Sequence, residues 1–525
     1  MVLLLAIPAL IPLARAYVDA YLQGKVATGF IIYDMAYYMA NAREHFDQGF
    51  QLTYGNPYAS YGTPAIYFQP QIFLLGCLQH LGLDPGLALN LFGLAALFFA
   101  VFVAVRFFEY VIGLETRAKL LGLVCFLWGG GMLSIAGAAA GFLQHKPLVD
   151  SLLTFDVSGG WWMFNFGRNL TYPTEAYYHG IFLLSLLCLM RRRLVASLLL
   201  AVLLSLSHPF TGLTLALILV TYCALELLLK THVVTPLAFA GSIVILILHL
   251  GYYVVFLNRF ADHRVVQGQW QIPWVLSHTS IGDWLYRPST YLPALIIVGG
   301  LAAMRLFQPP GLQLALRDSR VRLFLVWFLV VFALTQHNLI LAPHQPVHFA
   351  HGYDWMALFF LGAPVMLRTI DRLWSIRLPA VRYAAIGLLL VFVLLDNLIW
   401  YGSFFSPARH SQALTLTRDQ NAVLDWLDRN ARPPEMVVCQ DELVSYLVST
   451  YSTVHSWRGH HSNTPFVNQR REEVQGLFLA GRVLPEWDGM PVLYVALQST
   501  KWIPPPGSKE LYHNNQYIVW GNQRV

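Results

Sequence analysis

Long apolar runs recur along most of this sequence, and they constrain its fold more than any other feature. Most of them approach the ~20 apolar residues that a helix needs to cross a bilayer. Only 12% of the 525 residues are charged, whereas soluble domains have about 25%. The sequence therefore predicts an α-helical polytopic membrane protein with about eleven transmembrane helices, near 3–20, 86–107, 119–142, 177–190, 194–207, 210–229, 234–257, 289–306, 322–342, 354–369 and 379–402.

The distribution of arginine residues predicts how the chain is threaded. Basic residues cluster in short gaps between apolar runs, as at 191–193 and 317–322. Cytoplasmic loops are rich in such residues, so we place these gaps inside and the long loops 21–85 and 143–176 outside. In this threading the ambiguous run at 67–83 lies on the membrane surface. Because the basic residues serve this role, nucleic acid is not an expected partner.

The N-terminus and the cysteines add two smaller expectations. Residues 2–15 are apolar and lack a basic leader, so we interpret them as part of a first spanning helix rather than as a cleaved signal peptide. Four of the five cysteines fall inside apolar segments, and no CxxC motif occurs. Neither a disulfide framework nor a thiolate metal site is therefore expected.

The last part of the chain, residues 403–525, differs in character from the rest. The segment TRDQNAVLDWLDRN has helical spacing, and EMVVCQ, TVHSWRG, PVLYVALQ and NQYIVWG are β-like runs, with a helical DELVSYLVSTY between the first two. Alternating strands and helices predict a small soluble α/β domain. We therefore expect a transmembrane domain at 1–402 and, at 403–525, an extracytoplasmic domain of an inner or plasma membrane protein.

An aspartate stands out in the stretch GFIIYDMAYYMANAREHF, residues 29–46. A carboxylate at a membrane boundary is costly unless it faces water or a partner, and it often marks a functional site. Asp34 also opens a helical segment, where an aspartate commonly caps the helix with its side chain. The sequence leaves both interpretations open.

The second long loop contains further polar residues. Glu175 and His179 are four residues apart, so a helix would place them on one face. Glu175 is either part of this polar patch or a carboxylate at the start of a helix. Arg168 either binds a phosphate or anchors the membrane interface. Asp150 and Asp156 complete the polar residues of interest in this loop.

Several histidines lie in later outer loops. The motif SHPFTG places His208 where Pro209 separates two apolar runs, and LAPHQPVHFAHGYDW contains His344, His348, His351 and Asp354. Such spacing permits zinc binding, but no helix fixes the ligands. Contact with a phosphate or an acceptor, and simple loop polarity, are the alternatives. We rank His460 and His461 in the tail below these.

Three stretches resemble the GT-C superfamily of glycosyltransferases. The acidic residue after the first span opens a tyrosine-rich helix, and YGNPYASYGTPAIYFQPQIFLLGCL resembles the surface helix that closes the family's first outer loop. The order LFGLAALFFAVFVAVRFFE…TRAKLLGLVCFLW resembles its next two spans. The resemblance covers about residues 1–260. In the tail, YSTVHSWRGHHSNTP is similar to a segment of bacterial GT-C-like proteins.

The resemblance implies a function. It implies an inverting glycosyltransferase that moves a sugar from a polyprenyl-phosphate or polyprenyl-diphosphate lipid to a lipid, glycan or protein acceptor outside the cytoplasm. Asp34 matches the family's catalytic base, and Glu175 matches its second acidic position. A divalent cation, Mg²⁺ or Mn²⁺, held by these two residues is an open option. The residues expected to bind substrate are Glu175, Arg168, His179, Tyr37, His208, His344 and His348.

Other functions stay open at this point. A transporter or flippase would place charges within its spans and show repeated halves, and a membrane acyltransferase or glycan polymerase would centre on outer histidines and arginines. A non-catalytic scaffold would keep the fold and use the α/β tail as an interaction module. An outer pocket lined by Asp34, Glu175 and His179 would favour transfer to an acceptor.

Overall fold

The computed structural model describes residues 1–47, 49–130, 133–152, 166–269, 299–300, 302–305, 316–342, 344–405, 413–487 and 489–522. The chain divides into two compact units. We call the first the helical unit; it comprises Met1–Pro12, Gly93–Tyr253 and Gln271–Arg409. The second, which we call the mixed unit, comprises Leu13–Phe92, Val254–Trp270 and His410–Val525. Each unit is described by itself.

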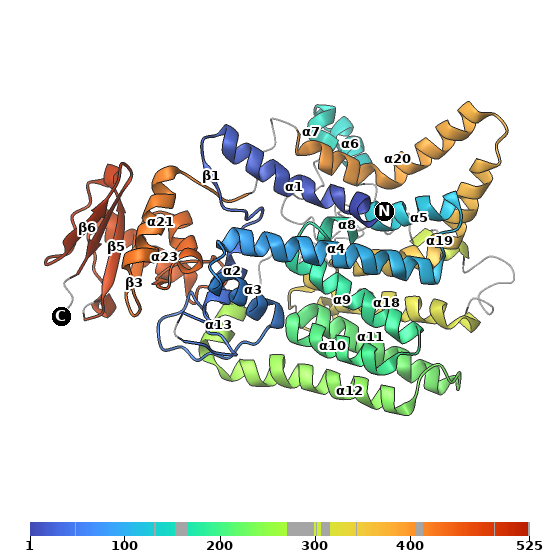
Figure 1. Cartoon of the computed structure of the whole chain (residues 1–525), viewed down its shortest axis with the longest axis horizontal. Helices are drawn as coiled ribbons and strands as arrows, with labels where there is room; N and C mark the ends of the chain where they lie inside the picture. Colours follow the sequence, from blue (N-terminus) through green and yellow to red (C-terminus); the bar gives the residue numbers. More distant parts are fainter. Residues whose placement is uncertain are drawn as a thin grey trace. The chain divides into compact units, whose positions relative to one another are not determined.

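The described part of the helical unit consists of α-helices with short connections (Figure 1). Neighbours in sequence pack as pairs, α9 against α10, α11 against α12 and α18 against α19. The helices are α5 (Arg117–Trp128), α6 (Leu133–Leu143), α7 (Leu148–Leu152), α8 (Phe166–Asn169), α9 (Pro173–Met190), α10 (Leu194–Ser207), α11 (Pro209–Leu228), α12 (Pro236–Leu250), α18 (Ser319–Thr335), α19 (Tyr353–Trp374) and α20 (Pro379–Ser403). Two further helices, α1 (Val2–Leu22) and α4 (Pro85–Val111), contain unit boundaries.

Several of these helices have the length and composition of membrane spans. Among the described residues, five are long and apolar enough to cross a bilayer: Val2–Leu22, Pro85–Val111, Pro209–Leu228, Pro236–Arg259 and Pro379–Ser403. They confirm the prediction of a polytopic helical membrane protein. The number of eleven spans stays a prediction, and most of the run at 289–306 lies outside the described residues.

One predicted helix differs in the structure. The run at 119–142 was expected to form one span, but it forms α5 and α6, and α5 ends at Gly129 in an extended conformation. A side-chain Cβ at Gly129 would lie 2.5 Å from the Trp355 ring of α19. Glycine therefore allows α19 to approach the end of α5, and the helix is interrupted at this point of close packing.

The mixed unit contains short helices and a five-stranded sheet. Its helices are α2 (Met35–Arg43), α3 (Pro70–His80), α13 (Ala261–Gln269), α21 (Arg418–Asn430), α22 (Glu442–Tyr451) and α23 (Val467–Ala480). Its strands are β1 (Val26–Ala27), β2 (Thr415–Leu416), β3 (Met436–Cys439), β4 (His455–Ser456), β5 (Val492–Leu497), β6 (Lys509–His513) and β7 (Tyr517–Gly521). Helix α3 has eleven residues and, at ~1.5 Å per residue, is about half as long as a ~30 Å hydrocarbon core is thick. It is therefore too short to cross that core, which is consistent with a helix on the membrane surface.

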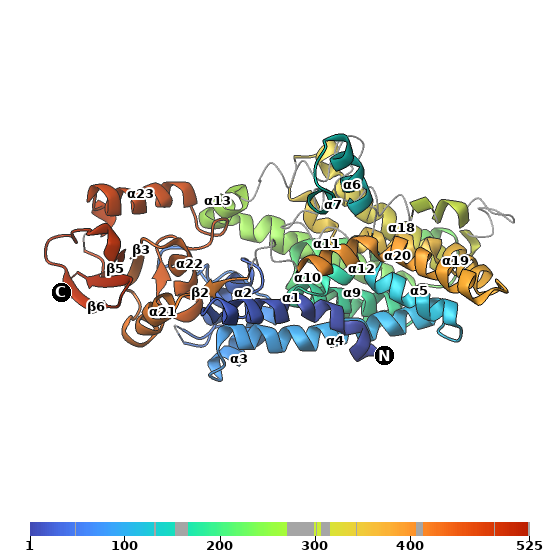
Figure 2. The ribbon, with the colours of Figure 1, turned by 90° about the horizontal axis from the view of Figure 1, so that it is seen from above.

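The sheet has the order β4-β3-β5-β7-β6. Strands β3, β4 and β5 are parallel, whereas β7 runs antiparallel to both β5 and β6. Connections between parallel strands are right-handed, and the connections through α22 and α23 run in opposite directions along the sheet. The two helices therefore cover opposite faces, as Figure 2 shows.

A hydrophobic cluster fixes α23 on its face of the sheet. Side chains of α23 pack against alternate residues of β3 and β5; the buried members are Met436, Val438, Trp457, Val474, Leu477, Phe478, Trp487, Val492, Tyr494 and Ala496. The predicted α/β domain is confirmed, with its four predicted strands and the helix at 442–451. Edge strand β6 and helix α23 were not predicted, because their apolar residues do not follow a clear strand or helix period.

The first long loop folds together with the tail. Strand β1 pairs antiparallel with β2 through Val26 and Leu416, and α2 packs against α22. The Thr450 hydroxyl of α22 donates to the Ala36 carbonyl oxygen at 3.0 Å. The domain boundary at 402–403 stays a prediction, and the contacts additionally group the first loop with the tail in the mixed unit.

Candidate functional site

The residues predicted to act on substrate fall into two groups, one in each unit. Asp34 and Tyr37 belong to the mixed unit, whereas the helical unit contains Glu175, Arg168, His179, His208, His344 and His348. Each group is described within its own unit. The single pocket that Asp34, Glu175 and His179 were expected to share stays a prediction.

Asp34 does not cap helix α2 with its side chain. It occupies the N-cap position with φ −69° and ψ −9°, and its side chain makes no capping hydrogen bond. Its Oδ1 instead accepts a hydrogen bond from Nε2 of His460 at 2.9 Å. The imidazole is buried, with 3% of the side chain exposed, but 46% of the Asp34 side chain is exposed. The capping interpretation is therefore wrong, and the carboxylate is both held and accessible.

The contacts of Nδ1, the other ring nitrogen of His460, show which of the two nitrogens carries the proton. Nδ1 lies 3.1 Å from the backbone N of Ser462, 3.2 Å from that of Asn463 and 3.0 Å from Asn463 Nδ2. All three groups are hydrogen-bond donors, so Nδ1 must be the acceptor and carries no proton. The ring proton is then on Nε2, which donates to Asp34. These contacts fix the Nε2–H tautomer of His460.

Aromatic rings surround this pair. The Tyr33 ring stacks on Tyr446 with centroids 4.3 Å apart, and the Tyr37 ring lies 5.2 Å from that of His460. The Tyr446 hydroxyl donates to the Tyr33 carbonyl oxygen at 2.5 Å and accepts from the Tyr37 backbone N–H at 3.0 Å. Burial raises the pKa of Tyr33 and Tyr37 to about 12, so their hydroxyls stay protonated at neutral pH. The tyrosines are therefore donors and contact surfaces rather than bases.

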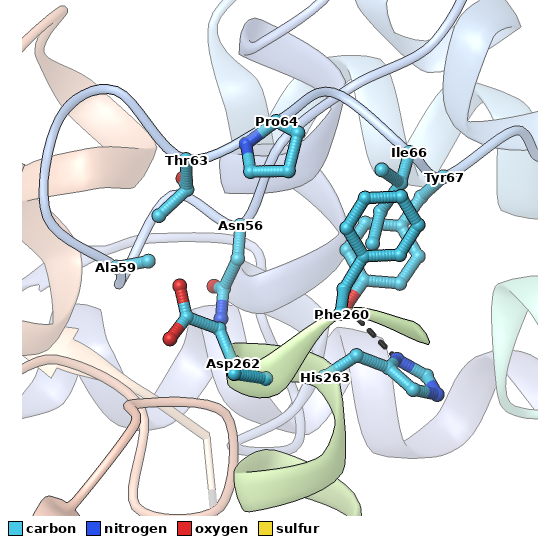
Figure 3. Close-up of a pocket in the computed structure, with 10 residues that line it drawn as sticks. Asn56, Ala59, Thr63, Pro64, Ile66, Tyr67, Phe260, Asp262 and His263 are labelled. Atoms are coloured by element: carbon cyan, nitrogen blue, oxygen red, sulfur yellow. Dashed lines mark hydrogen bonds between the residues drawn. The ribbon is translucent and has the colours of Figure 1, made fainter. Parts of the chain in front are cut away.

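The structure describes a small pocket elsewhere in the mixed unit, between the loop at 56–67 and the start of α13 (Figure 3). Its volume is about 100 Å³, and it is lined by Asn56, Ala59, Thr63, Pro64, Ile66, Tyr67, Phe260, Ala261, Asp262 and His263. In Figure 3 the Asp262 carboxylate points toward the loop, whereas His263 turns away and pairs with the Tyr67 hydroxyl at 3.1 Å. At ~30 Å³ per water molecule, the pocket holds only a small group and no lipid chain.

In the helical unit, Glu175 lies in a buried cluster of imidazoles. Its Oε1 is 3.0 Å from Nδ1 of His351, and 7% of the Glu175 side chain is exposed. His179, on the same face of α9, has Nδ1 2.7 Å from the Glu175 carbonyl oxygen and Nε2 2.8 Å from that of His351. Burial lowers the pKa of His351 to about 3. These contacts join the start of α9 to the loop before α19.

The other three histidines predicted to bind substrate, His208, His344 and His348, have protein partners in this unit. His208 accepts the Thr211 backbone N–H at 3.2 Å through Nδ1, so it caps helix α11. The His348 ring stacks on Phe210 at 4.8 Å. His344 is exposed, and its backbone N–H donates to His337 Nε2 at 2.8 Å. Their roles in substrate binding stay predictions.

Arg168 of α8 is fully buried. Its Nε donates to Asn397 Oδ1 at 2.6 Å, and Nη2 donates to the Asp396 carbonyl oxygen at 2.9 Å. The guanidinium also lies over the Trp400 ring, 4.9 Å from its centre. These contacts join α8 to α20, and phosphate binding by Arg168 stays a prediction.

The other acidic residues of interest in the outer loops are Asp150, Asp156 and Asp354. Asp150 lies exposed in α7, and Asp156 lies outside the described residues. Asp354 is buried in the first turn of α19, where its Oδ1 accepts the Trp355 backbone N–H at 2.8 Å.

No group of three or more His, Cys, Asp or Glu side chains that could hold a metal occurs among the residues that the structure describes. The imidazole beside Asp34 presents a protonated Nε2 and so offers no lone pair to a cation there. The reaction proposed below has no step through a metal. Metal binding by Asp34 and Glu175 stays a prediction.

His460 was ranked below the other histidines from the sequence, and Asn463 was not singled out. The signal that could have identified them is the polar stretch RGHHSN in the tail segment that resembles GT-C-like proteins. Nothing local in that stretch shows that it meets Asp34, because 426 positions separate Asp34 and His460. Only the folded mixed unit brings the two together.

Among the comparisons with known proteins, only the one with solved structures finds similar proteins. No protein-family model matches the sequence, and no curated protein sequence matches it. The crystal structure of ArnT from Cupriavidus metallidurans in the apo state is similar, with a TM-score of 0.52, 12% identity and coverage of 99% of this chain and 97% of that chain. ArnT bound to undecaprenyl phosphate gives a TM-score of 0.51 at 12% identity, covering 99% and 98% of the two chains. This chain therefore has the GT-C-like fold that its sequence predicts: a helical membrane protein with a C-terminal α/β domain.

Proposed function

We propose that this protein is an inverting glycosyltransferase that moves a sugar from a polyprenyl-phosphate or polyprenyl-diphosphate donor to an acceptor outside the cytoplasm, with Asp34 as the general base. The observation that carries the proposal is the half-exposed Asp34 carboxylate, held by His460 at 2.9 Å. It occurs in a chain whose fold follows ArnT over nearly its whole length, and an ArnT structure has undecaprenyl phosphate bound.

The proposed reaction is a single displacement. The acceptor hydroxyl oxygen attacks the anomeric carbon while the bond from that carbon to the phosphate oxygen breaks, which inverts the anomeric centre. The hydroxyl proton passes to the Asp34 carboxylate, and the lipid phosphate leaves as an anion. A positioned general base contributes about 100- to 10,000-fold to the rate of such a step. The neighbouring Tyr33 and Tyr37 cannot take this role at neutral pH, since burial raises their pKa to about 12.

The departing phosphate requires donor or cationic groups. Of the residues predicted to bind substrate, His344 is exposed and His348 is half-buried, so their rings are the more accessible candidates. Arg168 is fully buried and already bonded to Asn397. The proposal places the site on the outer face of the inner or plasma membrane, where lipid, glycan and protein acceptors of envelope biosynthesis are found.

The test uses the purified full-length protein in lipid nanodiscs with a panel of radiolabelled polyprenyl-phosphate and polyprenyl-diphosphate sugars and an envelope extract as acceptor source. We expect transfer from one donor, and its loss in Asp34→Asn at unchanged thermal stability. Asp47→Asn is the matched control, because Asp47 lies in the same unit but pairs with Arg43 at 3.1 Å. We expect that variant to keep its activity.

Two results would contradict the proposal. Full turnover by Asp34→Asn would remove this carboxylate from the reaction. Absence of transfer from every donor, together with movement of the labelled lipid across sealed vesicles that contain the protein, would favour a flippase instead.

A further inference from the structure

The pair formed by Asp34 and His460 has a feature that proton transfer alone does not require. The orientation of the imidazole is fixed by hydrogen bonds to Nδ1, on the side of the ring away from the Asp34 carboxylate. Three donors converge on Nδ1 at 3.0 to 3.2 Å, and they leave Nε2–H directed at Asp34 Oδ1, 2.9 Å away. A second proton on the ring would meet these three donors, so the ring stays neutral.

We infer that His460 is a positioning residue for the proposed general base: its neutral ring, locked in the Nε2–H tautomer by the loop at 462–463, holds the Asp34 carboxylate toward the substrate. This inference rests on the function proposed above. It also makes the C-terminal tail a part of the proposed site, because His460 belongs to the tail and Asp34 to the first long loop.

The loop that carries His460 is itself held in place. The Asn463 carbonyl oxygen accepts a hydrogen bond from Asn56 Nδ2 at 2.8 Å, and the Gly459 backbone N–H donates to the Thr464 hydroxyl at 3.1 Å. A Cβ at Gly459 would lie 2.1 Å from Cδ1 of the buried Tyr58 ring. The loop therefore packs directly on Tyr58 and has little freedom to move.

Holding the carboxylate has two consequences. A hydrogen bond from a neutral donor stabilises the ionised form of Asp34, the form that accepts a proton. Fixing one oxygen also orients the carboxylate, and a misplacement of about 1 Å costs about 100-fold in rate. His460 cannot itself take the proton from the acceptor, because Nε2 already carries one and Nδ1 is occupied by donors.

The surroundings of the pair matter for its pH dependence. The titratable and charged groups that face it, directly or through Tyr33 and His461, are Tyr33, Tyr37, Tyr58, Tyr446, His461, Glu442, Arg458 and Arg471. Burial raises the pKa of Tyr33 and Tyr37 to about 12 and lowers that of His461 to about 4. These three groups do not change charge near neutral pH, so a shift of the acid limb in a His460 variant reports on Asp34.

The same unit provides a matched control. His455 is also a buried tail histidine bonded to a carboxylate, Glu44, at 2.8 Å. It faces the Ala59 carbonyl oxygen at 3.1 Å with its other nitrogen, and 12% of the Glu44 side chain is exposed. The Glu44–His455 pair is thus also a contact between a buried histidine and a carboxylate, but its imidazole faces an acceptor on each side and its carboxylate is mostly buried.

The experiment compares wild-type protein with His460→Leu, His460→Gln and His455→Gln, using the donor found in the panel. We expect His460→Leu to lower kcat by about 10- to 100-fold, with little change in KM and with the acid limb of the pH–rate profile moved to higher pH. His460→Gln should recover most of the rate, because its amide can donate to Asp34. His455→Gln should lose thermal stability but keep its kcat per folded molecule.

A second measurement is independent of activity. In histidine-labelled protein, ¹⁵N resonances assigned to His460 by their loss in His460→Leu should show a protonated Nε2 and a bare Nδ1 at neutral pH. The Nε2 proton should exchange faster with water in Asp34→Asn. If wild-type protein transfers no sugar, the proposed function fails, and these spectra still decide whether the pair exists.

Three results would overturn the inference. The first is a doubly protonated His460 ring at neutral pH, and the second is wild-type kcat in His460→Leu. The third is a loss of rate in His460→Leu that is fully explained by a smaller folded fraction and that is not recovered in His460→Gln.

Discussion

The two units each contain a carboxylate paired with an imidazole, and the two pairs differ in access. In the mixed unit, 46% of the Asp34 side chain is exposed beside His460. In the helical unit, 7% of the Glu175 side chain and 5% of His351 are exposed. Both pairs bring together segments far apart in the sequence, at 2.9 and 3.0 Å. The difference shows that pairing alone does not mark a reactive group, because a substrate must also reach the carboxylate.

The histidines of the two pairs also differ in what surrounds them. His460 receives three donors on Nδ1 and so has one defined tautomer. His351 lies beside the Glu175 carboxylate and the His208 and His348 rings. Burial lowers its pKa to about 3, and its backbone oxygen accepts from His179 at 2.8 Å. The first arrangement directs a side chain, whereas the second ties a loop to a helix.

The largest expected effect separates the two carboxylates. Asp34→Asn should lower kcat by about 100- to 10,000-fold, the contribution of a general base, and leave the melting temperature unchanged. Glu175→Gln should weaken activity only a few-fold and lower the melting temperature, because it disturbs a buried cluster. Transfer assays and thermal unfolding of both variants check this. Equal losses of rate without loss of stability would show that the two carboxylates act together.

A second prediction concerns the buried cation of the helical unit. Arg168→Met should lower the free energy of unfolding by about 3 kcal/mol, because it leaves Asn397 and the Asp396 carbonyl without their donor. If the guanidinium only joins α8 to α20, KM for the lipid donor should not change in the folded fraction. Denaturant unfolding measures the stability, and titration with the donor measures KM, so together they distinguish a structural role of Arg168 from phosphate binding. A raised KM with full stability would instead place Arg168 at the phosphate.

A third prediction tests whether the His460 loop must pack closely. Gly459→Ala should lower kcat by about 10- to 100-fold, because a Cβ 2.1 Å from the Tyr58 ring must displace the loop and a misplacement of about 1 Å costs about 100-fold in rate. Gly476→Ala is the control: it lies within α23, where a Cβ would meet nothing closer than 3.9 Å, and it should add about 0.5–1 kcal/mol of stability. Equal activity of the two variants would show that the loop tolerates movement.

The smallest expected effect is an opposite pH dependence of two buried histidines. The pKa of His351 is lowered to about 3 by burial, so its contribution to stability is present above the unfolded value of about 6.5 and is lost as pH falls below it. Although burial opposes it, the hydrogen bond that the His455 ring donates to the Glu44 carboxylate raises the pKa of His455. The stability from His455 is therefore present below about 6.5 and is lost as pH rises through its folded pKa.

Hydrogen exchange of the two units between pH 5 and 8 measures this difference. Protection near His351 should increase with pH, and protection near His455 should decrease. His351→Leu and His455→Leu should each remove the dependence in their own unit only. A common trend in both units would indicate that other groups dominate the pH response.

Much of the fold follows from local sequence signals. Spanning helices are visible as apolar runs, and α21 begins where Thr417 and Gln420 form a capping box that the sequence displays. The strands of the tail were found because β-branched and aromatic residues lie between turn signals. The interruption at Gly129 was not predictable, because it depends on Trp355 of another helix.

The candidate site was predictable only in part. Asp34 could be singled out because a carboxylate at a membrane boundary is unusual. Its partner could not be identified, since no local pattern in the tail indicates which of its histidines, His455, His460 or His461, faces Asp34. Arg168 has the residue type of a phosphate ligand, yet its described contacts are to Asn397 and Asp396, which no sequence pattern shows.

The mixed unit is assembled from three stretches of chain that are far apart in the sequence. A ribosome must therefore finish almost the entire polypeptide before the loop at 460–463 can reach the aspartate made near the start, 426 positions earlier. A nascent or prematurely terminated chain would insert its apolar helices but would lack the hydrogen bond between Asp34 and His460. If Asp34 is the general base proposed above, an unfinished molecule therefore lacks the contact that positions it.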